Sequence, residues 1–417
     1  MAVVKQQIIK SDFNNAINEF EKTGLDKQER NSLLYHLEAG LLYHLAGLYK
    51  ESNSFLENAE WISDELYTRS LSKEAATLIT SDNILPYRGE YYEYLFSNYY
   101  KLLNYLYMNN LEDALVEVRR INHKLSLFKQ DDAFLHYLTA ILYQFNMQDA
   151  DAFIEYRKAY KAYSQDYESD HGIQMPLQLK KDIAVFCRES SFSRCREFPK
   201  SILDINQLPK DYGSVVIILE TGFIPDKKEE RIEAAIPQDY RKKHPDKLKE
   251  VYYLTVAIPA YSPESDFPQE AVIELDGKEY QMDLVEDLSS IARKRLNEKK
   301  TGIIAKATAR AVTKYVAYKA VRGNSGEQDD GNQESKNSTL KRLLGTAVNI
   351  AGAATEQADT RSWLTLPNRI FLTRYYLGSG SHKFKINIRS SEGNLTTSEV
   401  YSFALKKGEL KFIILRL

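Results

Sequence analysis

Apolar residues recur at helical spacing through the first half of the chain, and short polar patches interrupt them, which predicts a series of paired helices. The clearest pair takes Gly40 as its origin, with the aromatic Tyr43 one turn later. Small residues follow at Ser52 and Ala59, on either side of Leu56. Small side chains let two helices cross closely, and larger ones fill the remaining space. The same spacing recurs from Leu102 through Tyr105, Ala114, Val118 and Ile121, and from Ala140 through Tyr143, Ala152, Tyr156 and Ala159.

This spacing is typical of a tetratricopeptide-type helix pair. We therefore expect residues 1–200 to form an irregular helical-repeat domain, with an extra helix at about Trp61–Ile79 and a loop containing Pro86. Arrays of this kind present a concave groove that holds a peptide or a protein partner. The alternative is that the helices only pack against a second domain. The candidate partner-binding residues of the groove are Tyr43, Tyr105, Tyr143 and Tyr156.

The pattern changes from helices to strands between Phe198 and Pro209. Residues 201–417 are predicted to form an antiparallel-sheet domain with two helices, which makes the whole chain α+β. Apolar runs at Ser214–Glu220 and Val251–Ile258, the latter stopped by Pro259, predict strands, and the charged stretch 226–250 between them is expected to be a solvated loop. Further strands are predicted at Glu270–Leu275 and Lys278–Met282, around an Asp276-Gly277 turn, and at Arg369–Leu377, His382–Arg389, Glu399–Leu405 and Leu410–Arg416, as antiparallel neighbours.

The two helices of this domain are predicted at Leu284–Arg322, capped by Asp283, and at Leu340–Glu356. The polar stretch 323–339 between them has almost no apolar residue and is expected to be a disordered loop. The second helix is rich in small residues, which favours close packing in the core. Contact with a lipid surface is the alternative interpretation of that helix.

Size and charge narrow the classes of function. A chain of 417 residues exceeds the usual size of one hydrophobic core, so two domains are expected. A formal net charge of -2 gives no overall attraction for nucleic acid or an anionic membrane. No apolar run approaches the ~20 residues that span a bilayer, and the start shows no signal peptide. The segment Ser11–Phe20 resembles the second helix of a repeat whose first helix is a stub, which is compatible with the loss of an upstream segment.

Two cysteines, Cys187 and Cys195, are present. If Val185–Glu197 is one helix, they lie about 12 Å apart along its axis, too far for a disulfide. They can pair only if the serine-rich stretch between them breaks the helix. We expect two unpaired thiols, which leaves the cellular compartment open.

The sequence contains no phosphate-binding glycine loop, no Cys-x-x-Cys and no His-x-x-x-His. His36 and His44 lie two helical turns apart, but two ligands do not close a metal site. We therefore predict no cofactor, no metal and no catalytic residue.

Three segments together carry a resemblance: residues 215–229, the helix around 305–311, and the Asp359-Thr360-Arg361-Ser362-Trp363 motif that ends at Pro367. In this order, behind a helical half, they resemble a family of uncharacterised bacterial envelope proteins. Members typically carry a lipoprotein signal and a lipidated cysteine, so the resemblance implies a periplasmic location in the cell envelope. This chain has no such cysteine near its start, so either the start was trimmed or this member is not lipidated. Contact with a membrane is expected only in the first case, through a lost N-terminal lipid anchor.

The motif has two interpretations. Asp359 and Arg361 can pair or cap backbone groups, and Trp363 offers a large apolar body with one N–H donor. Alternatively, the three residues line a ligand site at a helix–sheet junction, as in a small-ligand-binding protein or an enzyme. Our first hypothesis for the chain is a non-catalytic adaptor of the cell envelope that binds a protein partner through the helical groove.

Overall fold

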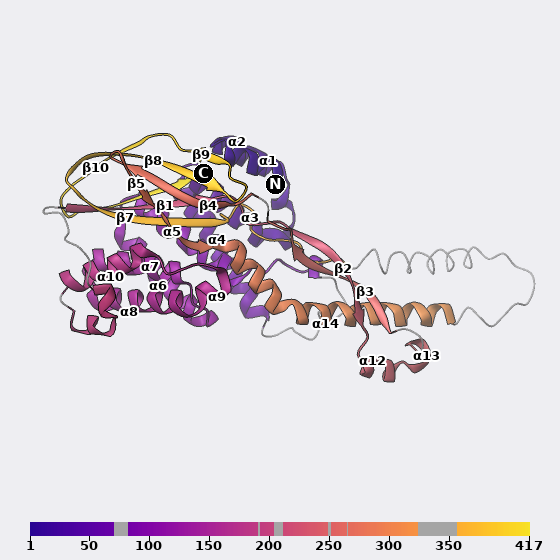
Figure 1. The fold of residues 1–417 in the computed structure, drawn as a ribbon. Helices are drawn as coiled ribbons and strands as arrows, with labels where there is room; N and C mark the ends of the chain where they lie inside the picture. The colour runs from indigo at the N-terminus through magenta and orange to yellow at the C-terminus, as the bar shows by residue number, and fades with distance from the viewer. Residues whose placement is uncertain (71–81, 191, 204–211, 249–251, 265, 324–356) are drawn as a thin grey trace, which may run out of the picture.

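The computed structural model describes residues 1–70, 82–190, 192–203, 212–248, 252–264, 266–323 and 357–417. It is an α+β structure with most helices in the first half of the chain and mainly antiparallel sheets in the second (Figure 1). The predicted loop 323–339 (beyond Gly323) and the predicted helix Leu340–Glu356 lie outside the described residues.

The helical layer contains three closely packed pairs, α3 with α4, α5 with α6, and α7 with α8. Gly40 allows the first crossing, since a Cβ at this position would overlap the Leu56 side chain of α4. The Ser52 hydroxyl also donates to the Gly40 carbonyl there, at 2.7 Å. The predicted separate helix at Trp61 is wrong as far as Ser70, because α4 continues through these residues without a break. The α-helices of this half are α1 (Ala2–Ile9), α2 (Phe13–Glu21), α3 (Ser32–Leu45), α4 (Tyr49–Ser70), α5 (Tyr91–Tyr107), α6 (Leu111–Phe128), α7 (Ala133–Phe145), α8 (Asp149–Ala162), α9 (Glu168–His171), α10 (Leu177–Glu189) and α11 (Lys200–Leu203), with short 3-10 or π segments at Leu25–Lys27, Glu29–Asn31, Asp82–Ile84, Tyr163–Tyr167 and Ser193–Glu197.

The strands form two main sheets and a separate two-stranded ribbon. Sheet A has the order β11-β1-β7-β6, sheet C has the order β10-β8-β4-β5 with β9 beside β8, and the ribbon pairs β2 with β3. The strands are β1 (Tyr212–Thr221), β2 (Lys227–Ala235), β3 (Tyr253–Tyr261), β4 (Pro268–Leu275), β5 (Lys278–Gln281), β6 (Asp283–Asp287), β7 (Arg369–Gly378), β8 (Gly380–Ser390), β9 (Leu395–Thr397), β10 (Tyr401–Leu405) and β11 (Leu410–Arg416), and the remaining helices are α12 (Gln238–Lys243), α13 (Pro245–Leu248) and α14 (Leu288–Gly323).

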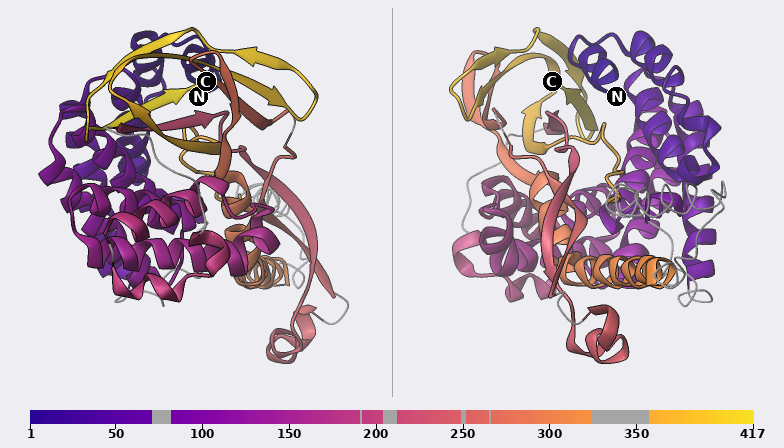
Figure 2. Two further views of the ribbon diagram at one scale, coloured as in Figure 1. Left: turned by 60° about the vertical axis from the view of Figure 1, so that its left-hand side comes forward. Right: turned by 90° about the vertical axis from the view of Figure 1, so that its right-hand side faces the viewer.

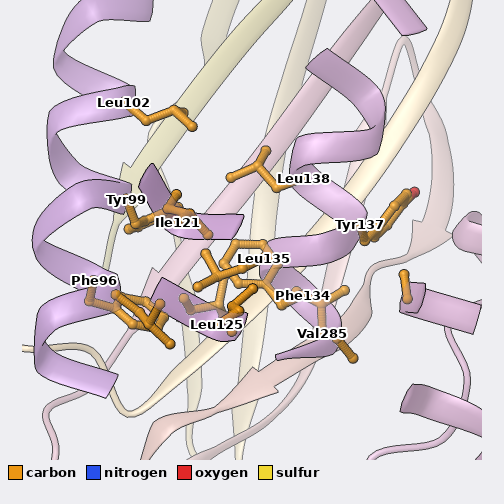
Figure 3. Close-up of a cluster of buried hydrophobic side chains, with 14 of the residues drawn as sticks. Phe96, Tyr99, Leu102, Ile121, Leu125, Phe134, Leu135, Tyr137, Leu138 and Val285 are labelled. Atoms are coloured by element: carbon orange, nitrogen blue, oxygen red, sulfur yellow. The ribbon is translucent and has the colours of Figure 1, made fainter. Parts of the chain in front are cut away.

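Sheet A lies between the helical layer and sheet C, so β1 is buried on both faces. Val216 and Ile218 belong to the core shared with the helices, while Val215, Ile217 and Leu219 face sheet C. A strand covered on both faces has no polar side, which explains the continuous apolar run in the sequence. The helix-side core appears in Figure 3, where side chains of α5, α6 and α7 converge with Val285 of β6.

Two of the predicted pairings among the four C-terminal strands are wrong, and the antiparallel pairing of β8 with β10 is confirmed. β7 and β8 belong to different sheets, and β11 does not pair with β10 but lies parallel to β1. Loop length predicts contact between consecutive strands only when the chain stays in one sheet, and here it changes sheet at Gly378–Gly380 and again at Lys406–Glu409. The Asp276-Gly277 hairpin is confirmed, with both turn residues at positive φ.

An arm projects from the body of the molecule (Figure 2). It consists of the β2–β3 ribbon with α12 and α13 at its end, and α14 packs along β3. The expected solvated loop at 226–250 is therefore wrong in large part, since it contains β2 and both short helices. Pro259 does not stop β3, because a two-stranded ribbon has open edges where the missing N–H is tolerated. The predicted start of the long helix also moves, because Asp283–Asp287 form β6.

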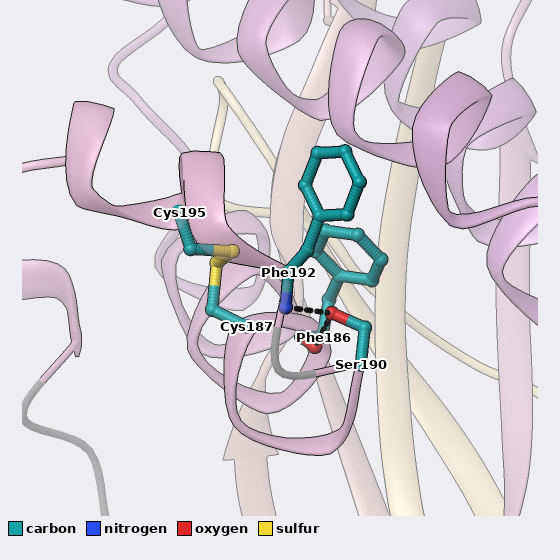
Figure 4. Close-up of a disulfide and its surroundings, with 5 residues drawn as sticks. All are labelled: Phe186, Cys187, Ser190, Phe192 and Cys195. Atoms are coloured by element: carbon teal, nitrogen blue, oxygen red, sulfur yellow. Dashed lines mark hydrogen bonds between the residues drawn. A yellow bond between two sulfur atoms is a disulfide. The ribbon is translucent and has the colours of Figure 1, made fainter.

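Cys187 and Cys195 form a disulfide with 5.6 Å between their Cα atoms, so the expectation of two free thiols is wrong (Figure 4). The helix α10 ends at Glu189, and the hydroxyl of Ser190 takes up the Phe192 N–H beyond it. The chain then turns back through a 3-10 segment that contains Cys195. The break in the helix brings the two sulfur atoms together.

Removing this disulfide should lower the free energy of unfolding. Closing so short a loop restricts the unfolded chain by about 2.5 kcal/mol. We expect the Cys187→Ser/Cys195→Ser variant to lose an amount of this order in urea unfolding. Adding a reductant should destabilise the wild type and leave the variant unchanged. Equal stability of the two proteins under oxidising conditions would contradict the pairing.

A pair of glycine substitutions tests the close helix crossing. A Cβ at Gly40 would overlap Leu56 Cδ2, whereas a Cβ at Gly302 in α14 meets nothing within 4 Å. We expect Gly40→Ala to destabilise the protein, because overpacking of about 1–3 kcal/mol outweighs a helix-propensity gain of about 1 kcal/mol. Gly302→Ala, the matched control, should gain up to about 1 kcal/mol in thermal or urea unfolding. A gain of stability in both variants would show that α3 and α4 do not cross closely at Gly40.

Candidate functional site

The segment with the Asp-Thr-Arg-Ser-Trp motif connects the helical layer to the sheets. Arg361 makes a two-point ion pair with Asp359, at 2.8 Å and 2.7 Å. Its remaining N–H groups donate to the carbonyls of Arg30 and Leu85 and to the Asn31 side chain, all in the helical half. Arg361 therefore ties this segment to the chain entering α3 and α5.

Trp363 is fully buried, and its contacts are structural. Its backbone N–H donates to Glu93 at 2.8 Å, and its indole N–H donates to the Thr365 hydroxyl at 3.1 Å. Glu93 also accepts from the Tyr87 hydroxyl. Both N–H groups of Trp363 therefore have partners within the protein.

Glu38 of α3 completes the junction from the helical side. It accepts from the Leu364 N–H at 2.7 Å and from the Thr365 hydroxyl at 2.5 Å. Burial raises the pKa of Glu38 to about 7, although these two hydrogen bonds oppose the shift. Lys227 donates to the Arg361 carbonyl at 3.2 Å, and its pKa is raised, since the nearby Tyr261, Glu90 and Glu93 outweigh burial.

The four candidate tyrosines of the helical groove do not form one exposed surface. Tyr156 is fully buried and Tyr143 is 6% exposed, so neither is available to a partner. Tyr43 and Tyr105 are partly exposed, and Tyr43 packs on Phe55 with ring centres 4.9 Å apart. Tyr43, Tyr105 and Tyr143 occupy the same position in the first helix of each pair, whereas Tyr156 lies in α8, the second helix of the third pair.

The inner face of the helical layer, formed by α5 and α7, is covered by sheet A. The hydroxyls of Tyr99 and Tyr100 donate to Glu220 of β1 at 3.0 Å and 3.1 Å. Tyr137 donates to Asp182, which also accepts from Tyr376 of β7. The helices therefore pack against the second half of the chain through this face, as the alternative interpretation expects.

Two more buried carboxyls lie at the same boundary. Asp132 caps the start of α7 by accepting from the Leu135 N–H at 2.8 Å, and Glu286 of β6 accepts from the Tyr167 hydroxyl at 3.2 Å. Burial and the neighbouring carboxyl raise the pKa of Glu286, and burial raises that of Asp132 to about 6. Burial and the closeness of two carboxyls both favour the uncharged form at this boundary.

An open groove lies on the outside, where β11 forms the edge of sheet A. We call this the β11 groove. Its cavity volume is about 420 Å³, within the range of about 300–1,000 Å³ of ordinary ligand pockets. Its walls are the corner between α5 and α6, the end of α7, and the strand: Leu106, Tyr107, Asn109, Asn110, Leu111, Leu142, Phe145, Glu409, Leu410, Lys411, Phe412 and Ile414.

The sequence interpretation missed the β11 groove. Phe145 is 39% exposed and Met147, two residues later, is 88% exposed. Two large apolar residues beside a turn could have indicated an exposed apolar surface from the sequence, because turns are usually polar. The other wall could not be found from the sequence, since β11 was placed beside the wrong strand.

Among the described residues, no helix is long and apolar enough to cross a membrane. No group of three or more histidines, cysteines and carboxylates within that part of the chain is arranged to hold a metal ion. No protein-family model matches the sequence, and neither the curated proteins nor the solved structures contain a match.

We predict that the contribution of the buried Glu38 to the free energy of unfolding changes with pH in the opposite direction to that of Glu60, a second glutamate in the helical layer. Burial would raise the pKa of Glu60, but ion pairs with Lys124 and Lys101 lower it to about 2. For Glu38, folding binds a proton between about pH 4.5 and pH 7, so the wild type loses stability as the pH rises through this window. Relative to Glu38→Gln, that loss should be about 3 kcal/mol.

Glu60→Gln is the matched control. Its ion pairs stabilise the wild type above about pH 4.5, and the contribution is lost as the pH falls towards 2. The wild-type advantage over Glu60→Gln should therefore grow with rising pH, while the advantage over Glu38→Gln should shrink. Urea unfolding at several pH values measures both differences. Parallel pH profiles for the two variants would contradict the assignment of Glu38.

Proposed function

We propose that the chain is a non-catalytic binding protein of the bacterial cell envelope and that it holds a protein partner at the β11 groove. The contrast between two places supports this proposal. At the Asp359/Arg361/Trp363 junction the polar groups have partners within the protein and Trp363 is fully buried, whereas the β11 groove is open and carries apolar side chains such as Phe145 and Phe412 beside polar ones. Open apolar surface beside a rigid core is typical of a protein-binding site.

The disulfide supports the location. Disulfides persist in oxidising compartments such as the bacterial periplasm and are rare in the cytosol. The Cys187–Cys195 bridge therefore fits the envelope location that the family resemblance implies.

We interpret the three packed helix pairs as tetratricopeptide-type units with an unusual use. Their inner face supports sheet A, through contacts such as those of Tyr99 and Tyr100 with Glu220, in place of holding a peptide. The partner is instead met by the ends of these helices, where the α5–α6 corner and Phe145 of α7 flank the sheet edge. A ligand or catalytic site at Asp359, Arg361 and Trp363 has less support, because these side chains already hold the two layers together.

A photo-crosslinking residue in place of Phe145 tests the proposal. In cells of its bacterial host we expect a discrete adduct with one envelope protein, because Phe145 lies in the groove wall and is 39% exposed. The adduct is identified by mass spectrometry, and its partner is purified for calorimetry. Phe145→Asp should weaken the binding at least tenfold, since a charge replaces an apolar contact worth about 1.5–3 kcal/mol.

Leu395 in β9 is the matched control position, since it is 65% exposed and belongs to sheet C. The crosslinker there should give no adduct with the same protein, and Leu395→Asp should bind normally. Thermal unfolding confirms that both aspartate variants are folded. Unchanged affinity of Phe145→Asp for the purified partner would contradict the assignment of the groove.

A further inference from the structure

We propose that the partner enters the β11 groove as an extended segment that adds one strand to sheet A and places an apolar side chain in the cavity. This inference rests on the proposed function, because it names the kind of partner that the groove takes. The argument starts from the pairing of β11 with β1.

The parallel pairing decides which backbone groups of β11 face outwards. Ser214 N–H of β1 donates to the Glu409 carbonyl at 2.8 Å, and Leu417 N–H donates to the Glu220 carbonyl at 3.0 Å. In a parallel pair every second residue directs both backbone groups to the same neighbour. The odd-numbered residues of β11 therefore face β1, and the N–H and C=O groups of Leu410, Phe412 and Ile414 face the open edge.

Tyr107 shows what this edge binds. Its hydroxyl accepts from the Ile414 N–H at 3.2 Å and donates to the Ile414 carbonyl at 3.1 Å. One side chain thus takes up the two groups that a neighbouring strand would use. The Tyr107 ring is fixed by stacking on Tyr49, with ring centres 4.8 Å apart. The open part of the edge is therefore the stretch before Ile414, at Leu410 and Phe412.

The spacing of these groups fits an extended backbone. Leu410 and Phe412 are two residues apart on one strand, which separates their outward groups by about 6.6 Å, the repeat of a neighbouring strand. A helix already uses its backbone groups internally and cannot pair with them. Extended segments that add to a free sheet edge are an established mode of peptide recognition.

The walls of the groove favour a single strand over a second copy of the chain. The α5–α6 corner and the end of α7 stand beside the edge, with Leu111 and Phe145 in the wall. A second copy pairing through its own β11 would bring its own helix corner into the same space. A narrow segment of another protein fits between the walls.

The side chains of the cavity set the sequence preference. Leu106, Leu111, Leu142 and Phe145 surround the space beside Phe412. In an added strand, alternate side chains point to the same side. The residue that faces the helices should therefore be apolar, such as valine, and its neighbours on the other side can be polar.

A synthetic peptide tests this mode of binding. The probe is a fluorescent seven-residue peptide of sequence Lys-Val-Thr-Val-Thr-Val-Lys, and the matched control carries N-methyl groups on alternate amides that would pair with β11. Fluorescence anisotropy with the full chain should show saturable binding of the probe and at least tenfold weaker binding of the methylated peptide. Equal affinity of the two peptides would overturn the strand-addition proposal.

Two variants of Phe412 separate the backbone contact from the side-chain contact. Phe412→Pro removes the outward N–H without removing any bond to β1, and Phe412→Ala keeps that N–H. Phe412→Pro should abolish binding of the probe, while Phe412→Ala should weaken it by a smaller factor. The N-methylated peptide still decides the question if Phe412→Pro fails to fold.

The outcomes for the two proposals are distinguishable. Suppose that Phe145→Asp no longer binds the purified envelope partner, while Phe412→Pro and Phe412→Ala bind it with equal affinity. The groove is then a binding site, and strand addition is wrong. If the partner binds Phe145→Asp normally, the proposed function itself fails. Both proposals are supported if Phe145→Asp and Phe412→Pro each lose binding of the partner and of the probe. The methylated peptide should then bind the wild type at least tenfold more weakly than the probe.

Discussion

The structure depends on burying both faces of β1. One face meets the helical layer through Val216 and Ile218, and the other meets sheet C through Val215, Ile217 and Leu219. A strand with two apolar faces has to be covered on both sides, since each exposed large side chain would lose about 1.5–3 kcal/mol. The helical layer and sheet C are therefore parts of one packing arrangement, even though they come from different halves of the chain.

Polar contacts determine how the helical layer sits on the sheet. Glu220, at the end of the apolar run of β1, is buried and receives hydrogen bonds from Tyr99 and Tyr100, and burial raises its pKa. Glu38 does the same for the segment around Thr365. A buried carboxyl is costly when its partners are missing, so a shifted arrangement of the layers is disfavoured. Apolar packing supplies the attraction, and these carboxyls select the position.

Much of the local structure could be predicted from the sequence. The apolar run 215–219 identified β1, the Asp276-Gly277 pair identified a hairpin, and small residues such as Gly40 identified helix crossings. These features depend on side chains that are close in the sequence. The mixed α+β class followed from the change of pattern near Pro209.

Long-range features could not be predicted. The parallel pairing of β11 with β1 joins Ser214 to Leu410, and no local pattern encodes it. The disulfide depended on where α10 ends, and the predicted continuous helix through Ser190 hid it. The motif drew attention to Trp363 and Arg361, but their contacts with Glu93, Asn31 and the Leu85 carbonyl are tertiary and could not be predicted from it.

The order of strands in sheet A also constrains the order in which the protein can be completed during synthesis. The helices α3 to α8 emerge from the ribosome long before β7 and β11, which cover their apolar side together with β1. Until then the nascent chain carries an uncovered layer of tyrosine and leucine side chains, the kind of surface that chaperones bind.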